Sequence, residues 1–504
     1  MKSVWRAVAV LYLCLTGGYA CAQKMIEYTA GTGSRYPDRA NVWVLYNGVK
    51  ASHEGMTLDA DSAHYNTLEN SFTAFGDIVI RLTDTTTIWG DSLYYDGNAR
   101  VVDIWADTVV LVDGETTLKS NHLTYNRNTS TAYYNLWGHG TSSDRVLDSK
   151  QGFYNSALKE FYIYGDVVLS DSSATLLTDT LTYNTISRIA HFESPTHIYS
   201  DSSVIYSELG DYNTTSRFAI SYRGSHVDNQ KKSIDSDTLY YDAIQEYGKA
   251  FGHVNIIDST NDLHCTGRYG ETNQSLHYSF VTDSAHVLFI DNGDSLFLHA
   301  DTIYITTDSS NHMQAVRANY KVKLYRRDVQ AMGDSAFYSA SDSVITLFGS
   351  PFLWYDHYQC SADTISLFID SAGVKHAYLR NDCFAIEQVD RDRFNQLKGK
   401  RGRVYFENGE PKYVDILGNA QMVYYITETN AERRPELVGV NVGVGTDMRI
   451  YFDNNRAPAR VVTYDKADMQ TYPVEALPDD QKQLNGYNWA PQKRPRSPQD
   501  VFVW

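Results

Sequence analysis

Apolar and polar positions along the chain follow a repeat of about 30 residues. A unit that begins Asp-(Ser/Thr), with a tyrosine four residues after the aspartate, starts at 61, 91, 179, 237 and 334, and degenerate copies start at 121, 150, 208 and 265. The run Asp301 to Tyr304 is a shorter variant. Successive starts from 61 to 265 differ by 28 to 30 residues. Such regular self-similarity predicts a repeat architecture.

Each unit has a second half in which a small residue precedes strict alternation, as in Gly76 to Ile80 and Gly165 to Leu169. Alternation of period two is typical of strands rather than helices. Turn residues follow the tyrosines, as in Tyr95-Asp96-Gly97-Asn98, and such clusters reverse antiparallel pairs. Each unit therefore predicts two strands and two turns.

The fold class follows from stacking, because no single unit can bury its apolar face alone. About 13 stacked units, with one strand per wall, predict an elongated all-β body of two facing sheets. We place the repeats at residues 44–473, after a lead-in at 23–43.

Residues 1–22 have the parts of a secretory signal: Lys2 and Arg6, an apolar run, and Ala20 and Ala22 around Cys21. We expect cleavage before Gln23 and export of the chain. Lipidation of Cys21 is the alternative, but Gly18 stands where that signal has a leucine-like residue.

Export leaves Cys265, Cys360 and Cys383, so one disulfide is possible but a disulfide framework is not. The net charge of -17 argues against nucleic acid as a partner, because nucleic-acid binders cluster cations.

The segment 474–504 is rich in Pro and Gln, with a basic patch at Lys493, Arg494 and Arg496. It lies outside the repeat and predicts a mobile or partner-docked tail. The alternative is a segment that covers the open edge of the last strand.

Catalytic chemistry is not indicated. The Asp-Ser pairs recur in many units, whereas catalysis requires one constellation, and we expect them to bond backbone amides of turns. The sequence has no H-E-x-x-H, C-x-x-C, G-x-S-x-G or P-loop motif, and His264-Cys265 lacks metal-ligand spacing. We therefore predict no catalytic residue, no metal and no cofactor. The tyrosines favour strand-face packing over a binding ladder.

The order of small residue, D-S-L-x-Y and Gly-x-Val-x-Leu resembles the OstA-like proteins, relatives of the periplasmic bridge of lipopolysaccharide transport. It is carried by "GMTLDADSAHYNTLENSFTAFGDIVI", "WGDSLYYDGNARVVDIWADTVVLVDGETTLKSNHLTYN" and "LKGKRGRVYFENGEPKYVDILGNAQMVYY". The resemblance covers roughly residues 44–473. It implies a β-jellyroll folded like a taco, whose interior carries lipopolysaccharide acyl chains between the inner and outer membranes. The length of the chain and its tail depart from the family's pattern.

The resemblance implies that the protein is a periplasmic lipopolysaccharide carrier. It also allows an association of the protein with the outer membrane. Its implied partners are lipopolysaccharide, the inner- and outer-membrane components of the transport machinery, and, through end-to-end self-association, further copies of the chain. The alternatives are an exported β-solenoid that binds or acts on polysaccharide and a surface adhesin. Individually the alternating apolar residues read as ordinary core, but as a set they are candidates for the lining of a lipid groove: Ile78, Ile80, Val167, Leu169, Val254, Ile256, Val287, Phe289, Val322 and Leu324.

Overall fold

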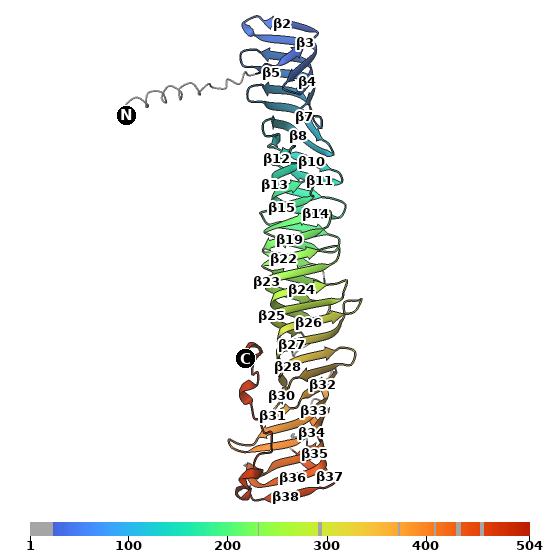
Figure 1. Ribbon diagram of the computed structural model, residues 1–504, viewed down its shortest axis with the longest axis vertical. Helices are drawn as coiled ribbons and strands as arrows, with labels where there is room; N and C mark the ends of the chain where they lie inside the picture. Colours follow the sequence, from blue (N-terminus) through green and yellow to red (C-terminus); the bar gives the residue numbers. More distant parts are fainter. Residues whose placement is uncertain are drawn as a thin grey trace, which may run out of the picture. The chain divides into compact units, whose positions relative to one another are not determined.

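The computed structural model describes residues 24–229, 231–290, 295–370, 373–407, 410–429, 435–453 and 458–503. The predicted signal peptide lies outside these residues. The chain divides into two compact units, residues 1–200 and 201–504. In the described residues, regular structure consists of antiparallel strands and short 3-10 turns, so the all-β prediction is confirmed (Figure 1).

Unit 1 consists of strands that follow one another in chain order. They are β1 (Glu27–Thr29), β2 (Thr32–Tyr36), β3 (Arg39–His53), β4 (Met56–Asn66), β5 (Ser71–Arg81), β6 (Thr86–Asp96), β7 (Val101–Asp113), β8 (Thr116–Asn126), β9 (Thr131–Tyr134), β10 (Gly138–Ser142), β11 (Arg145–Ser149), β12 (Gln151–Asn155), β13 (Glu160–Ser170), β14 (Ala174–Asn184), β15 (Ile189–Phe192) and β16 (Thr196–Ser200).

Unit 2 continues the pattern and ends in four 3-10 turns. Its elements are β17 (Val204–Ser207), β18 (Leu209–Asn213), β19 (Phe218–Arg223), β20 (Ser225–Asp228), β21 (Lys232–Ser236), β22 (Thr238–Asp242), β23 (Tyr247–Asp258), β24 (Leu263–Asn273), β25 (Tyr278–Phe289), β26 (Leu296–Thr307), β27 (Met313–Tyr325), β28 (Val329–Ser339), β29 (Val344–Phe348), β30 (Phe352–Tyr355), β31 (Tyr358–Ser361), β32 (Thr364–Asp370), β33 (Gly373–Gln388), β34 (Phe394–Glu407), β35 (Glu410–Thr429), β36 (Pro435–Phe452), β37 (Pro458–Tyr464), β38 (Asp468–Tyr472), η1 (Val474–Ala476), η2 (Asp479–Gln481), η3 (Pro491–Lys493) and η4 (Pro498–Phe502).

The long strands cross two walls, so the prediction of one strand per wall is wrong for them and holds for short strands such as β9, β10, β11 and β12. Strand β8 shows this: residues 116–119 pair with β10, whereas residues 124–126 pair with β9. The register shifts in the middle of the strand, between Trp105 and Val109 of its other partner, β7. We call wall A the strand halves that contain Ile78 and Val167, and wall B the halves that contain the repeat tyrosines. Each long strand therefore bends once, and its two halves face each other across the core.

The Asp-Ser signature marks this bend rather than a turn. Asp61 lies beside Gly76 of the next strand, and the register shifts there. Gly76 has a φ of 77°, and a side chain on it would overlap the Asp61 carboxylate. Glycine is therefore required by the backbone conformation and by the close approach of the aspartate.

The turns that join the strands at wall B are capped by the residue after the repeat tyrosine. The Oδ1 atom of Asp96 accepts hydrogen bonds from the backbone amides of Asn98 and Ala99, both at 2.9 Å. Asn184 does the same for Ile186 and Ser187. The turn clusters therefore lie where the sequence predicts them, but this Asx role belongs to these residues and not to the Asp-Ser pairs.

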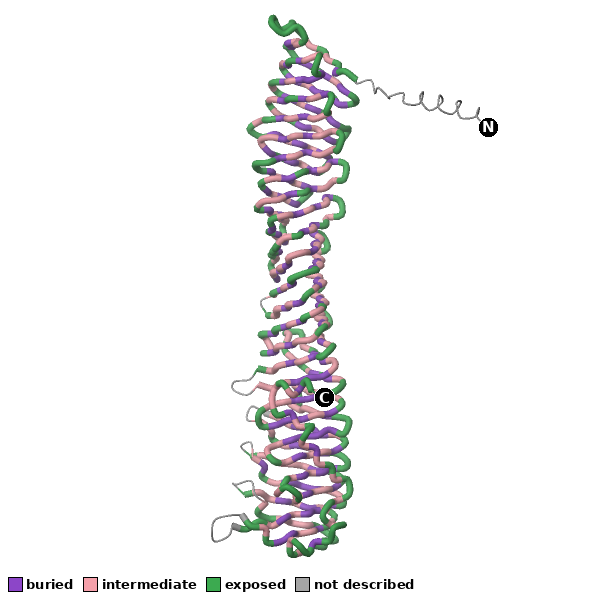
Figure 2. The backbone as a smooth tube through the Cα atoms, turned by 90° about the vertical axis from the view of Figure 1, so that its left-hand side faces the viewer, coloured by how far each residue is buried: buried purple, intermediate pink, exposed green. Residues whose placement is uncertain are grey.

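Within each unit, buried and exposed positions alternate along the strands (Figure 2). One row of interior side chains lies at the end of wall B that is farthest from the bend, which we call the free end of the wall. We call this row the mouth row. In unit 1 it contains a fully or almost fully buried tyrosine on every second strand: Tyr65, Tyr95, Tyr125, Tyr154 and Tyr183. The prediction that the tyrosines pack in the fold therefore agrees with their positions in unit 1.

The assignment of Tyr269 and Tyr304 to the same repeat position is wrong. Both lie on the outer face, where Phe280 packs between them at ring-centroid distances of 5.7 and 5.1 Å. The mouth row passes instead through Thr272 and Ile305. The tyrosine spacing in these units differs by one or more residues, and this moves the ring to the opposite face of the strand.

The C-terminal segment packs on the outer face of wall A of unit 2, so the prediction of a mobile tail is wrong, while its docking to a partner stays a prediction. Gln396 Nε2 donates to Lys482 O (2.8 Å), and its Oε1 accepts from Leu484 N (2.9 Å). Further along, Arg494 Nε donates to Gln330 Oε1 at 2.7 Å. In Figure 1 the red segment runs beside the strands of unit 2. The tail is therefore an ordered strap over more than the last strand.

Within the described residues, Cys265, Cys360 and Cys383 are free thiols. Burial raises the pKa of Cys265 and of Cys360 to about 12 in each case, and it also raises the pKa of Cys383. The thiolate is the reactive form, so these side chains behave as inert core residues.

Candidate functional site

The interior between the two walls is the candidate site. Opposite the bends, the free ends of the two walls approach each other, and in unit 1 side-chain contacts join them. We call this edge the rim. Asp113, at the free end of wall A, is fully buried and accepts a hydrogen bond from Tyr154 Oη at 2.8 Å and one from Lys159 Nζ. Both donors belong to wall B. Burial alone would raise the pKa of Asp113, but hydrogen bonds from Lys159, Tyr154 and Thr85 hold it below its ordinary value.

A second rim contact lies at the first turn of the repeats. Arg100 Nε and Glu54 Oε2 form an ion pair at 2.7 Å across the rim. Beside it, Tyr95 Oη lies 2.6 Å from His53 Nδ1 and accepts a hydrogen bond from Arg127 at 2.9 Å. Polar side chains from both walls therefore join where the interior would otherwise open.

A third rim contact in unit 1 follows the same spacing. Arg188 donates to Ser143 Oγ at 2.9 Å and to the carbonyl oxygen of Ser142 at 3.4 Å. Arg100, Lys159 and Arg188 are each the last residue of a wall B turn, with a positive φ between 57° and 62°. The turn geometry therefore directs a cationic side chain to the rim at these three places.

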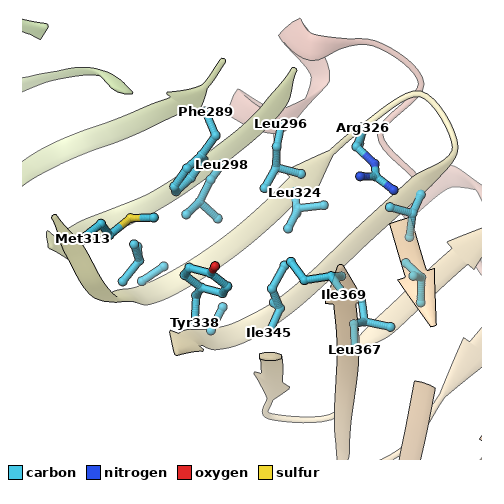
Figure 3. Close-up of a pocket in the computed structure, with 15 residues that line it drawn as sticks. Phe289, Leu296, Leu298, Met313, Leu324, Arg326, Tyr338, Ile345, Leu367 and Ile369 are labelled. Carbon is cyan, nitrogen blue, oxygen red and sulfur yellow. The ribbon is translucent and has the colours of Figure 1, made fainter. Parts of the chain in front are cut away.

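In unit 2 the interior opens into an apolar cavity of about 210 Å³. Its lining side chains come from both walls and converge on one space (Figure 3). Arg326 lies among them and forms a bidentate pair with Asp328, at 2.6 and 2.7 Å. The lining residues are Phe289, Leu296, Leu298, Met313, Val316, Ala318, Leu324, Arg326, Val329, Ala336, Tyr338, Ile345, Leu367, Ile369 and Val374.

Two smaller apolar cavities follow along the interior of unit 2. One of about 70 Å³ is lined by Leu379, Cys383 and Ile416, among others. One of about 30 Å³ is lined by Met422 and Ile450, among others. The rings of Tyr355 and Phe406, which line the cavity of about 70 Å³, meet across the rim at 5.2 Å.

The sequence-predicted groove residues all lie on wall A. Nine are buried inside: Ile78, Ile80, Val167, Leu169, Val254, Ile256, Val287, Val322 and Leu324. Phe289 is half-buried. Only Phe289 and Leu324 of the ten line the large cavity. The structure thus places each residue of the set on the interior side of wall A within its own unit, and it brings two of them to an open space.

Sequence reasoning missed the wall B side of the cavity. Val316, Tyr338, Ile345 and Leu367 belong to the mouth row and line the cavity. A signal was present, because the tyrosine of the earlier units gives way to Ile305 and Leu367 in the later ones. The loss of a large side chain at a repeat position marks where the interior is less filled.

The described part of the chain contains no group of three His, Cys, Asp or Glu side chains that could hold a metal ion. The same residues also contain no helix with the length and apolarity needed to cross a membrane. What the interior can do chemically is bind apolar groups away from water.

Comparisons with known proteins find a family model that matches part of the chain. Residues 25–171 and, in an overlapping second match, residues 162–237 match the family model described as OstA-like protein. Among solved structures, the crystal structure of LptH, the LptA homologous periplasmic component of the conserved lipopolysaccharide transport device from Pseudomonas aeruginosa, is similar at 13% identity. That similarity covers 29% of this chain and 96% of LptH, with a TM-score of 0.22. Among curated proteins no match is found.

Proposed function

From the match of residues 25–237 to the OstA-like family model, we propose that this chain is an exported carrier of lipopolysaccharide. In this proposal the chain works in the periplasm and moves the lipid between the inner and outer membranes. It binds and shields the acyl chains and performs no chemistry on them. The partners are the membrane components of the transport machinery at either end.

The observation that carries this proposal is the apolar interior, which widens into the cavity of unit 2. Each methylene exposed to water costs about 0.8 kcal/mol, so a chain of a dozen carbons costs on the order of 10 kcal/mol. An interior that offers apolar side chains from two facing walls removes most of that cost.

An exported enzyme acting on polysaccharide is less well supported. Such an enzyme needs carboxylates that converge on one substrate bond. The repeat aspartates lie instead at the bends of successive strands, where Asp61 contacts Gly76 and Asp237 accepts from the backbone amide of His253 at 3.3 Å. Their role in these contacts is structural.

The test is to purify the exported protein from cells that make lipopolysaccharide, after mild detergent-free lysis, and to measure bound lipopolysaccharide by mass spectrometry. A protein prepared from the same cells but unfolded and refolded in buffer is the control, and it should take up added lipopolysaccharide. Absence of bound lipid in both preparations would refute the carrier function.

A further inference from the structure

We propose that the acyl chains bind in the cavity of unit 2, between β25 and β33, and that the interior of unit 1 excludes them. This inference rests on the proposed function. It places the ligand outside residues 25–237, the part of the chain that matches the OstA-like model. The ligand class is an amphiphile with linear acyl chains.

The first argument is the mouth row. Across unit 1 every second strand places a tyrosine in this row, and the hydroxyls reach the rim, as Tyr154 does at Asp113. In unit 2 the row keeps buried tyrosines at Tyr212 and Tyr241, and from β24 onward the corresponding positions are Thr272, Ile305, Tyr338 and Leu367. Three of these four side chains are shorter than tyrosine. The space that tyrosines fill in unit 1 is therefore partly vacant where Leu367 lines the cavity.

The second argument is the rim. In unit 1 three cross-rim contacts, Glu54 with Arg100, Asp113 with Lys159 and Ser143 with Arg188, close the interior from the side. Admitting a chain there would separate Asp113 from Lys159, its cationic partner, and from Tyr154, and leave the buried carboxylate with only threonine hydroxyls as donors. Breaking a buried pair in this way costs several kcal/mol.

The third argument is size and lining. Apolar cavities of roughly 150 Å³ bind ligands as large as benzene, so about 210 Å³ admits a segment of an acyl chain. Of the lining side chains, Arg326 and the Tyr338 hydroxyl are polar, and the others are apolar. Arg326 with its partner Asp328 places a charged pair at the cavity, a suitable position for the polar end of an amphiphile.

The experiment compares matched interior positions in the full-length exported protein. A small diazirine amino acid is introduced at Leu298, which lines the cavity, or at Leu111, which is the equivalent wall A position in unit 1. After irradiation with purified lipopolysaccharide, we expect at least a tenfold higher crosslinking yield at Leu298. Equal yields, or a higher yield at Leu111, would overturn the location while leaving the carrier function intact. No crosslink at either position, together with no copurified lipid, would refute the carrier function itself.

A reciprocal pair of variants tests the filling argument. Leu367→Tyr restores the tyrosine of the mouth row and should reduce crosslinking at Leu298 by about tenfold, whereas Tyr125→Leu should raise crosslinking at Leu111. Circular dichroism and melting temperature establish that each variant is folded. Unchanged crosslinking at Leu298 in folded Leu367→Tyr would contradict the proposal. If that variant does not fold, the comparison of crosslinking at Leu298 and at Leu111 in the otherwise native protein still tests the location of the acyl chains.

Discussion

Gln359 and Ala490, which are 131 residues apart in the chain, are joined by a hydrogen bond of 2.8 Å from the backbone amide of Ala490 to Gln359 Oε1. The same side chain donates from Nε2 to the carbonyl oxygen of Asn488 at 2.6 Å. One amide thus binds the tail backbone through both a donor and an acceptor, as a neighbouring strand would. Gln396 repeats this arrangement with Lys482 and Leu484.

We predict that Gln359→Leu lowers the free energy of unfolding by about 2 kcal/mol. The amide is buried, and its loss leaves the Ala490 amide and the Asn488 carbonyl without their partner. Denaturant unfolding monitored by tryptophan fluorescence measures the change. The control is Gln314→Leu, because Gln314 is exposed, and that change should stay within about 0.5 kcal/mol. Equal effects of the two variants would show that the tail does not depend on this contact.

A second prediction concerns the rim of unit 1. Asp113→Ala should destabilise the protein by about 3 kcal/mol at neutral pH, because it leaves Lys159 and Tyr154 without their buried acceptor. Glu54→Gln, at the more exposed pair with Arg100, should have a smaller effect. Urea unfolding at low and high salt checks both, since added salt should weaken the Glu54 contact more than the Asp113 contact. A smaller loss for Asp113→Ala than for Glu54→Gln would contradict this view of the rim.

The repeat, the all-β class and the interior set could be predicted from the sequence because period-two alternation fixes which side chains share a face. The bend could not be predicted. Gly76 and Asp61 read as the ends of strands, and only the pairing of neighbouring strands shows that the chain continues through them. The cavity and the packing of the C-terminal strap could not be predicted from the sequence either, because the contacts of Leu367 and Gln359 are with residues far away in the chain.

A third prediction concerns pH. Burial, and then the neighbouring His299 and His264, lower the pKa of His286 to about 4, and burial likewise lowers that of His299. The ring of Phe502 covers both, at 5.0 and 5.2 Å. Because the unfolded chain binds protons to these histidines near pH 6.5 and the folded chain does not, stability should fall as the pH drops from about 6.5 toward 4.

The measurement is the melting temperature at pH 7.5 and at pH 5. The double change His286→Asn with His299→Gln should reduce the difference between these two values, because it removes two groups that take up protons on unfolding. His253→Asn is the control, since that histidine is exposed and pairs with Asp237. If the double variant keeps the full pH dependence of the native protein, the buried histidines are not its source.

The last prediction separates the two roles that the sequence leaves open for the tail. Truncation after Pro473 removes Ala490 from Phe352 and Trp354, and Leu477 from Val423 and Tyr425. These apolar side chains would then face water, so we expect the melting temperature to fall by at least about 5 °C and the protein to bind an apolar dye. Calorimetry and light scattering of the native and truncated chains measure this. A monodisperse truncated protein with an unchanged melting curve would show that the strap contributes nothing to the fold and would return the tail to a role in partner docking.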